Sequence, residues 1–167
     1  MKVPLIAFIL VTAMGFSGCE KYNSSRDVDK YIDELISGTY KSYDLPDFNT
    51  TDISALLEYR NETTVITNFP QNPVSSFRQS ECKLGMMVLW TVESLRAVEN
   101  NSRFLIGRFP SLNPVLVLKE SSEPQMVFDD KSHKEAAKAY YDWWNSCRPF
   151  KDKISTDPLA KTHYRWH

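Results

Sequence analysis

The chain has 167 residues, of which 42% are hydrophobic, and its 20 basic and 21 acidic side chains give a formal net charge of −1. This balance offers no electrostatic case for binding nucleic acid, and no block of like charge forms a binding tail. Only five glycines occur, and the P-loop, Gly-x-Ser-x-Gly and His-Glu-x-x-His motifs are absent, so the sequence carries no positive sign of an enzyme.

The N-terminus has the features of a secretory signal peptide. Lys2 supplies a positive charge, residues 4–15 are almost wholly apolar, and the small residues Ser17 and Gly18 precede Cys19. The apolar run is too short for a membrane-spanning helix, which needs about 20 residues. The sequence therefore predicts an exported protein from which residues 1–18 are removed.

The order Phe16-Ser17-Gly18-Cys19 resembles the lipobox of bacterial lipoproteins. The resemblance implies a diacylglyceryl thioether on Cys19, cleavage before it, and acylation of the freed amine with palmitate-like chains. Several chains anchor durably, because each buried methylene contributes about 0.8 kcal/mol. We expect the membrane to be a partner through Cys19, at the outer membrane of the cell envelope, with the periplasmic or surface face left open. The alternative is an ordinary signal peptide followed by a chance cysteine.

The mature chain divides into a short polar tether at residues 19–26 and one globular domain at 27–167. Apolar residues at helical spacing predict helices from Asp27 to Gly38, Asp52 to Asn61, Ser80 to about Val98, and Asp130 to Cys147. Val115–Leu118 and Met126–Phe128, separated by residues of turn composition, predict two paired strands. We expect a mainly α, single compact helical domain with one small antiparallel β-hairpin, onto which the tail at 151–167 straps.

One internal echo stands out. Residues 66–74 resemble residues 106–115, and their two Phe-Pro pairs lie 40 positions apart, a period found in helical repeats. Only two copies are visible where three are usual, so chance or reuse of a Phe-Pro turn is the alternative.

The cysteines suggest one disulfide. If lipidation uses Cys19, then Cys82 and Cys147 remain in a chain exported to an oxidising compartment. We expect them to meet if the third and last predicted helices pack antiparallel, each contributing one end. The alternative is two free, buried thiols that behave as small apolar residues.

Histidines and acids offer weak candidate sites. His133 lies close in sequence to Asp129, Asp130 and Glu135, residue types that hold metals or act as acid and base. The simpler interpretation is that the aspartates cap the last helix while His133 and Glu135 are solvated. His163 and His167 have i, i+4 spacing at the C-terminus, with no third ligand nearby. We therefore assign no catalytic residue, metal site or cofactor.

The last predicted helix carries two aromatic stripes. Tyr140 and Trp143 lie on one, and Tyr141 and Trp144 lie beside it, which together are too wide for a helix buried on one face. Exposed rings in an envelope protein stack on sugars or dock partners, so Tyr141 and Trp144 are candidate ligand-binding residues. The alternative, which we favour, is that both stripes are core and covered by the aromatic residues of the tail.

Two stretches, from Leu56–Asn61 through Gly85–Trp90 and at Asp157–His167, resemble a small family of lipoproteins from Bacteroides-type bacteria. That family has no established activity, so the resemblance supports an envelope location and transfers no site residues. We expect a lipid-anchored, non-catalytic module that binds an envelope protein or a glycan. The alternative is a small periplasmic hydrolase whose catalytic residues converge only in the fold.

Overall fold

The computed structural model describes residues 24–167. The predicted signal peptide and Cys19 lie outside the described residues. Within them the fold is mainly helical with two small antiparallel sheets, which confirms the predicted fold class. The first helix begins at Ser24, so helix replaces the last part of the predicted polar tether.

The helices are α1 (Ser24–Ile36), a 3-10 turn η1 (Thr50–Asp52) that leads into α2 (Ile53–Glu58), α3 (Leu84–Glu99), α4 (Asp130–Trp144) and α5 (Phe150–Ser155). The strands are β1 (Val65–Ile66), β2 (Cys82–Lys83), β3 (Leu116–Leu118), β4 (Met126–Val127) and β5 (Tyr164–Trp166). β1 pairs with β2, and β4, β3 and β5 form a three-stranded sheet in that order.

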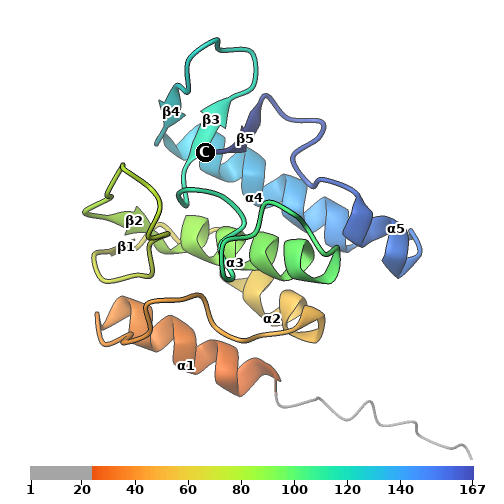
Figure 1. Ribbon diagram of the computed structural model, residues 1–167. Helices are drawn as coiled ribbons and strands as arrows, with labels where there is room; N and C mark the ends of the chain where they lie inside the picture. Colours follow the sequence, from red (N-terminus) through yellow and green to blue (C-terminus); the bar gives the residue numbers. More distant parts are fainter. Residues whose placement is uncertain (1–23) are drawn as a thin grey trace, which may run out of the picture.

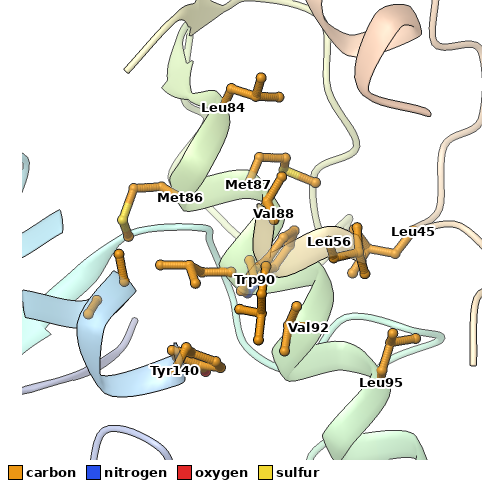
Figure 2. Close-up of a cluster of buried hydrophobic side chains, with 14 of the residues drawn as sticks. Leu45, Leu56, Leu84, Met86, Met87, Val88, Trp90, Val92, Leu95 and Tyr140 are labelled. Carbon is orange, nitrogen blue, oxygen red and sulfur yellow. The ribbon is translucent and has the colours of Figure 1, made fainter. Parts of the chain in front are cut away.

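α3 is the central element of the fold. It crosses the middle of the molecule, with α1 and α2 on one side and α4 with the three-stranded sheet on the other (Figure 1). Nearly all of its residues are buried, because apolar side chains lie on most sides of the helix. Figure 2 shows the resulting core, in which Trp90 of α3 lies between Leu56 of α2 and Tyr140 of α4.

The start of α3 differs from the prediction. The sequence predicts a helix that begins at Ser80, but the chain is still extended at Cys82 and Lys83, which pair with β1. The first amides of α3 then donate to the backbone of the preceding segment, Leu84 N to Thr64 O at 2.8 Å and Gly85 N to Glu62 O at 2.9 Å. Backbone carbonyls thus do the work of a capping side chain.

The C-terminal tail straps onto the body, as predicted. β5 adds to the β3–β4 hairpin by pairing Leu116 with Trp166 and Leu118 with Tyr164. A short helix in the tail, α5, was not predicted. Pro149 ends the preceding segment, but its fixed φ also suits the start of a helix, and its carbonyl accepts from Asp152 N and Lys153 N.

The predicted Cys82–Cys147 bridge is wrong for this structure, in which both cysteines are free. α3 and α4 run in the same direction: the first turn of α4 meets the first turn of α3, and Tyr140 meets Glu93 further along both helices. Cys82 therefore precedes α3 at one end of the pair and Cys147 follows α4 at the other. The helices are parallel because residues 100–129, including the β3–β4 hairpin, carry the chain back to the start of α3.

The two echoing segments are loops that pack against each other. The Asn72 side chain donates from Nδ2 to Ser111 O at 2.9 Å, and the Asn113 amide group bonds to Ser75 Oγ at 2.8 Å. Both asparagines are buried. The resemblance between the segments thus coincides with a contact between paired loops, and the second copy leads into a strand.

Candidate functional site

Neither a membrane span nor a metal cluster is found in the part of the chain that the structure describes. No helix among residues 24–167 is long and apolar enough to cross a bilayer. No group of three or more His, Cys, Asp or Glu side chains in that range is placed to hold a metal ion.

A hollow of about 420 Å³ lies at the end of the molecule where α3 and α4 begin, between β2 and β4. We call it the His133 cleft. Its volume falls within the range of small-molecule sites, about 300–1,000 Å³. Much of its lining is apolar, from Val65, Phe77, Met86, Val115, Val127 and Phe128. Polar side chains from β2 and the start of α4 complete it, among them His133.

His133 is buried, with 3% of its surface exposed, so the simpler interpretation of it as a solvated residue is wrong. Its Nε2 lies 2.8 Å from Arg60 O, and because a carbonyl only accepts, Nε2–H is the donor. Gly85 makes room for this contact. A methyl group placed on Gly85 would lie 2.5 Å from His133 Nε2 and 2.6 Å from Arg60 O. The packing of the two helix starts therefore buries the histidine.

The buried ring is a hydrogen-bond acceptor. Burial lowers the pKa of His133 below its ordinary value, although the bond to Arg60 O opposes that shift. The neutral ring that donates from Nε2 carries a lone pair on Nδ1. Nδ1 has no hydrogen-bond partner among residues 24–167, and it is not one of their fully enclosed polar atoms. His133 lines the cleft, and its Nδ1 is an acceptor that a ligand could use.

The two neighbouring aspartates each have a hydrogen-bond or ion-pair partner that stabilises the charged form. Asp129 caps α4, as predicted, by accepting from Ser132 N at 2.9 Å, and this bond lowers the pKa of its carboxyl. Asp130 pairs with Lys83 Nζ at 2.6 Å, which likewise lowers its pKa. Both carboxylates are weak proton acceptors in these positions.

Cys82 lines the cleft but is a poor nucleophile. Its Sγ donates weakly to Pro114 O at 3.9 Å, and burial raises the pKa of the thiol to about 12. Nucleophilic catalysis requires the thiolate. The cleft therefore offers hydrogen-bond acceptors and apolar walls, but not an activated nucleophile at this position.

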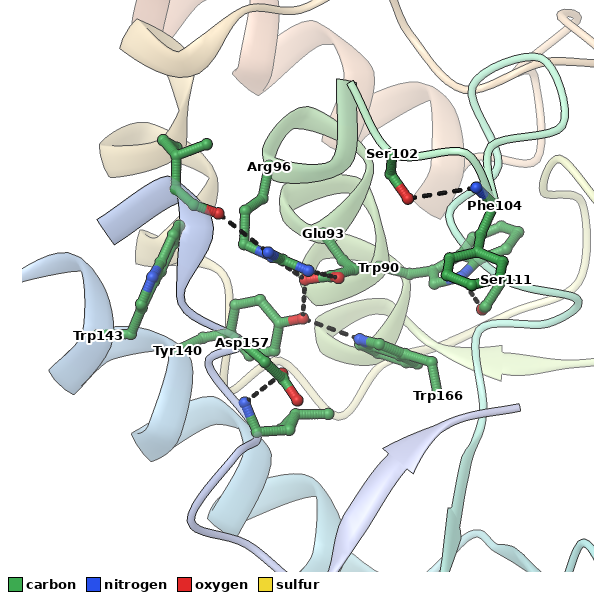
Figure 3. A network of polar contacts seen from close by, with 12 residues as sticks. Trp90, Glu93, Arg96, Ser102, Phe104, Ser111, Tyr140, Trp143, Asp157 and Trp166 are labelled. Atoms are coloured by element: carbon green, nitrogen blue, oxygen red, sulfur yellow. Dashed lines mark hydrogen bonds and ion pairs between the residues drawn. The ribbon is translucent and has the colours of Figure 1, made fainter. Parts of the chain in front are cut away.

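The two aromatic stripes of α4 differ in burial and in the residues that they contact. Tyr140 and Trp143 are buried, and Trp166 of the tail packs over Tyr140, as expected (Figure 3). Tyr141 and Trp144 are not covered by the tail. The Arg60 guanidinium lies 4.2 Å from the centre of the Tyr141 ring, while Trp144 Nε1 donates to Ser54 Oγ at 2.8 Å.

These contacts favour a packing role for Tyr141 and Trp144. Tyr141 remains 44% exposed, and Trp144 is half-buried with Lys153 Nζ 5.2 Å from its ring centre. One face of each ring is already against a cation, which leaves less surface for stacking on a ligand.

The two C-terminal histidines flank β5 and share no helix, and His167 Nδ1 bonds to the Asn113 amide.

Sequence reasoning missed the residues that form the cleft walls, since Phe77 and Phe128 come from a loop and from the end of a strand. Among the residues around His133, only Gly85 carries a signal in the sequence that could have indicated the burial of the histidine. An isolated glycine inside an apolar helical pattern indicates close packing, and here the missing side chain of Gly85 leaves the space that the His133 ring fills.

Residues 22–167 match the family model described as "Domain of unknown function (DUF4943)", and the chain belongs to that family. No curated protein and no solved structure matches the chain.

Proposed function

We propose that this member of the DUF4943 family is a lipid-anchored protein of the bacterial cell envelope that binds a glycan, without catalysis, in the His133 cleft. The observation that carries the proposal is that the cleft with apolar walls is also lined by the buried, neutral His133, whose Nδ1 is an acceptor without a hydrogen-bond partner among residues 24–167. The lipobox resemblance at Cys19 supports the lipid anchor, and the resemblance of residues 56–90 and 157–167 to Bacteroides-type lipoproteins supports the outer membrane as its location.

The position of the first helix supports an anchored domain with an outward site. Four residues separate Cys19 from Ser24, a reach of about 13 Å when extended. α1 then spans about 20 Å before its C-terminal end meets the segment after β1, where Asn68 Nδ2 donates to Gly38 O at 2.7 Å. β2 and the start of α4, which line the cleft, therefore lie at the end of the fold opposite the start of α1 (Figure 1).

Sugar chemistry fits the lining of the cleft. A sugar ring presents apolar faces that pack on aromatic and aliphatic side chains, and hydroxyls that donate to acceptors. His133 Nδ1 and the Asp129 carboxylate accept, while Phe128, 58% exposed, offers a ring at the rim. A peptide would need the same donors, so a protein partner is an outcome of the test.

The hydrolase alternative finds less support in the same groups. Hydrolysis of a glycan uses two carboxyls, one of which is held protonated. Asp129 and Asp130 both have lowered pKa values and fixed partners. Binding is therefore the better proposal, and release of reducing sugar would count against it.

The test is calorimetric binding of a panel of oligosaccharides to the lipoprotein in detergent. We expect Phe128→Ala to weaken binding of the preferred sugar about tenfold, a loss of about 1.4 kcal/mol. Phe104→Ala is the matched control, because Phe104 is 68% exposed and does not line the cleft. Equal effects of both variants, or no binding of any sugar in the panel, would contradict the proposal.

The anchor has its own test, motivated by the order Phe16-Ser17-Gly18-Cys19. We expect Cys19→Ala to abolish metabolic labelling with a fatty acid and to leave an uncleaved precursor or a soluble form. Detergent partitioning that is unchanged in this variant would rule out the lipid on Cys19.

A further inference from the structure

A second hollow adjoins the His133 cleft. It has a volume of about 940 Å³ and lies between the connector at residues 40–44, the loop at 68–73 and the turn at 106–109. Arg78 lines both hollows. The loop that carries Arg78 is therefore the ridge between two neighbouring sites, and a long ligand that crosses it would contact both.

The Arg78 guanidinium is exposed and unpaired. Within residues 24–167 it has no ion pair, hydrogen bond or ring contact. Two other cations in this part of the molecule are paired: Lys83 Nζ with Asp130, and Arg108 with Asp47 at 2.5 Å. Arg78 thus keeps its full donor capacity at the junction of the hollows.

The second hollow has firm walls and one free aromatic ring. Asn68 Nδ2 donates to Gly38 O and Tyr40 O, and Tyr40 Oη donates to Asp44 O at 2.8 Å. Gly107, at φ 59°, lets the turn approach Asp44, whose Oδ2 would lie 3.3 Å from an added methyl group. Tyr43 lines this hollow and is 94% exposed, so its ring is open for stacking on a sugar.

The geometry points to an extended acidic polysaccharide as the ligand, with sugar units in both hollows and the carboxylate of a uronic acid on Arg78. This inference rests on the proposed glycan-binding function. A guanidinium presents a planar fork that matches a carboxylate with two parallel hydrogen bonds. Each hollow is lined by both signs of charge: Lys41 and Asp44 line the larger one, and Lys83, Glu81 and Asp129 line the cleft. Lys83 is already paired with Asp130, so the unpaired Arg78 at the junction is the cation to which we assign the acidic group.

The experiment compares uronic-acid oligosaccharides of about two and six units with neutral oligosaccharides of the same lengths, by calorimetry on the intact lipoprotein. We expect the six-unit acidic chain to bind about tenfold more tightly than the neutral one. Arg78→Gln should remove that preference, a loss of about 1.4 kcal/mol. Arg103→Gln is the matched control, because Arg103 is an exposed arginine that lines neither hollow.

A second variant tests the span. Tyr43→Ala should weaken the six-unit chain several-fold and leave the two-unit chain in the cleft unaffected. Equal losses for Arg78→Gln and Arg103→Gln, or no gain with chain length, would overturn the inference. A sulfated chain that binds more tightly than the uronic chain would also overturn the assignment of a carboxylate. If only neutral sugars bind and Phe128→Ala weakens them, the inference fails while the proposed function stands; if no sugar binds, both fail.

Discussion

Two regions of α4 pack polar side chains against α3, and they differ in how many of those polar groups have hydrogen-bond partners. Around Tyr140 the groups are paired: its Oη donates to Glu93 Oε2 at 2.7 Å and accepts from Trp166 Nε1 at 2.8 Å (Figure 3). Glu93 also forms an ion pair with Arg96, whose Nη1 donates to Ile154 O at 3.0 Å. Two helical turns earlier, His133 has one partner and one free acceptor.

The contrast separates stabilisation from recognition. A buried network in which every group is paired holds together the elements that supply it, here α3, α4, α5 and β5. His133 Nδ1 has no such partner among residues 24–167 and is not fully enclosed, so a ligand can supply the missing donor. The Tyr140 network therefore holds the C-terminal tail (residues 151–167) against α3 and α4, and the His133 cleft is the better candidate for function.

The largest effect is expected where the first turns of α3 and α4 pack against each other. Gly85→Ala should destabilise the domain by about 3 kcal/mol, because the added methyl would meet two backbone carbonyls and the His133 ring, all closer than 3.0 Å. In an ordinary helix the same change stabilises by about 0.5–1 kcal/mol. Urea unfolding measures it, with Gly38→Ala, a positive-φ glycine, as a control that should cost about 1–2 kcal/mol. A variant as stable as the parent would refute the close packing.

The paired network is tested by removing one hydroxyl. Tyr140→Phe should cost about 1–3 kcal/mol, because Trp166 Nε1 loses its acceptor and Glu93 loses a donor in a buried site. Tyr141→Phe is the matched control on the next position of the same helix, and should change the free energy of unfolding by less than about 0.5 kcal/mol. If the two variants have the same free energy of unfolding, the Tyr140 hydroxyl does not hold the C-terminal tail in place.

Acid should weaken the fold through its histidines. Burial lowers the pKa of His133, and burial with nearby Arg165 lowers that of His167. The unfolded chain then binds more protons below pH 6.5, so stability is full above that pH and falls as the pH drops toward the folded pKa values. Urea unfolding at pH 7.5 and 5.5 measures the loss, which His133→Gln should reduce. A stability that rises toward pH 5.5 would contradict it.

The smallest effect concerns the thiols. Cys147 is exposed and Cys82 is buried with a raised pKa. We expect an aromatic disulfide reagent at pH 8 to modify Cys147 quickly in the native protein and Cys82 only after denaturation. If neither thiol is modified in denatured protein that has not been reduced, the two cysteines form a disulfide and the expectation of free thiols is wrong.

Much of the fold was readable because the signals are local. The apolar stripes of α1 and α4, the Asp129 cap and the two strands of the hairpin follow from residues within a few positions of each other. The parallel packing of α3 and α4 was not readable, because a 30-residue segment decides which end of α4 returns to α3. The disulfide prediction failed for that reason.

The sequence by itself determined the resemblance at Cys19, the mainly helical class, the burial of α3 and the attachment of the tail, since apolar spacing decides which face of an element leaves water. Only the tertiary structure decided that His133 is buried, that α3 starts against the carbonyls of Glu62 and Thr64, and that Arg78 divides two hollows. Each depends on backbone segments far apart in the chain coming within hydrogen-bonding distance. No local pattern encodes such contacts, because packing of the whole core sets them.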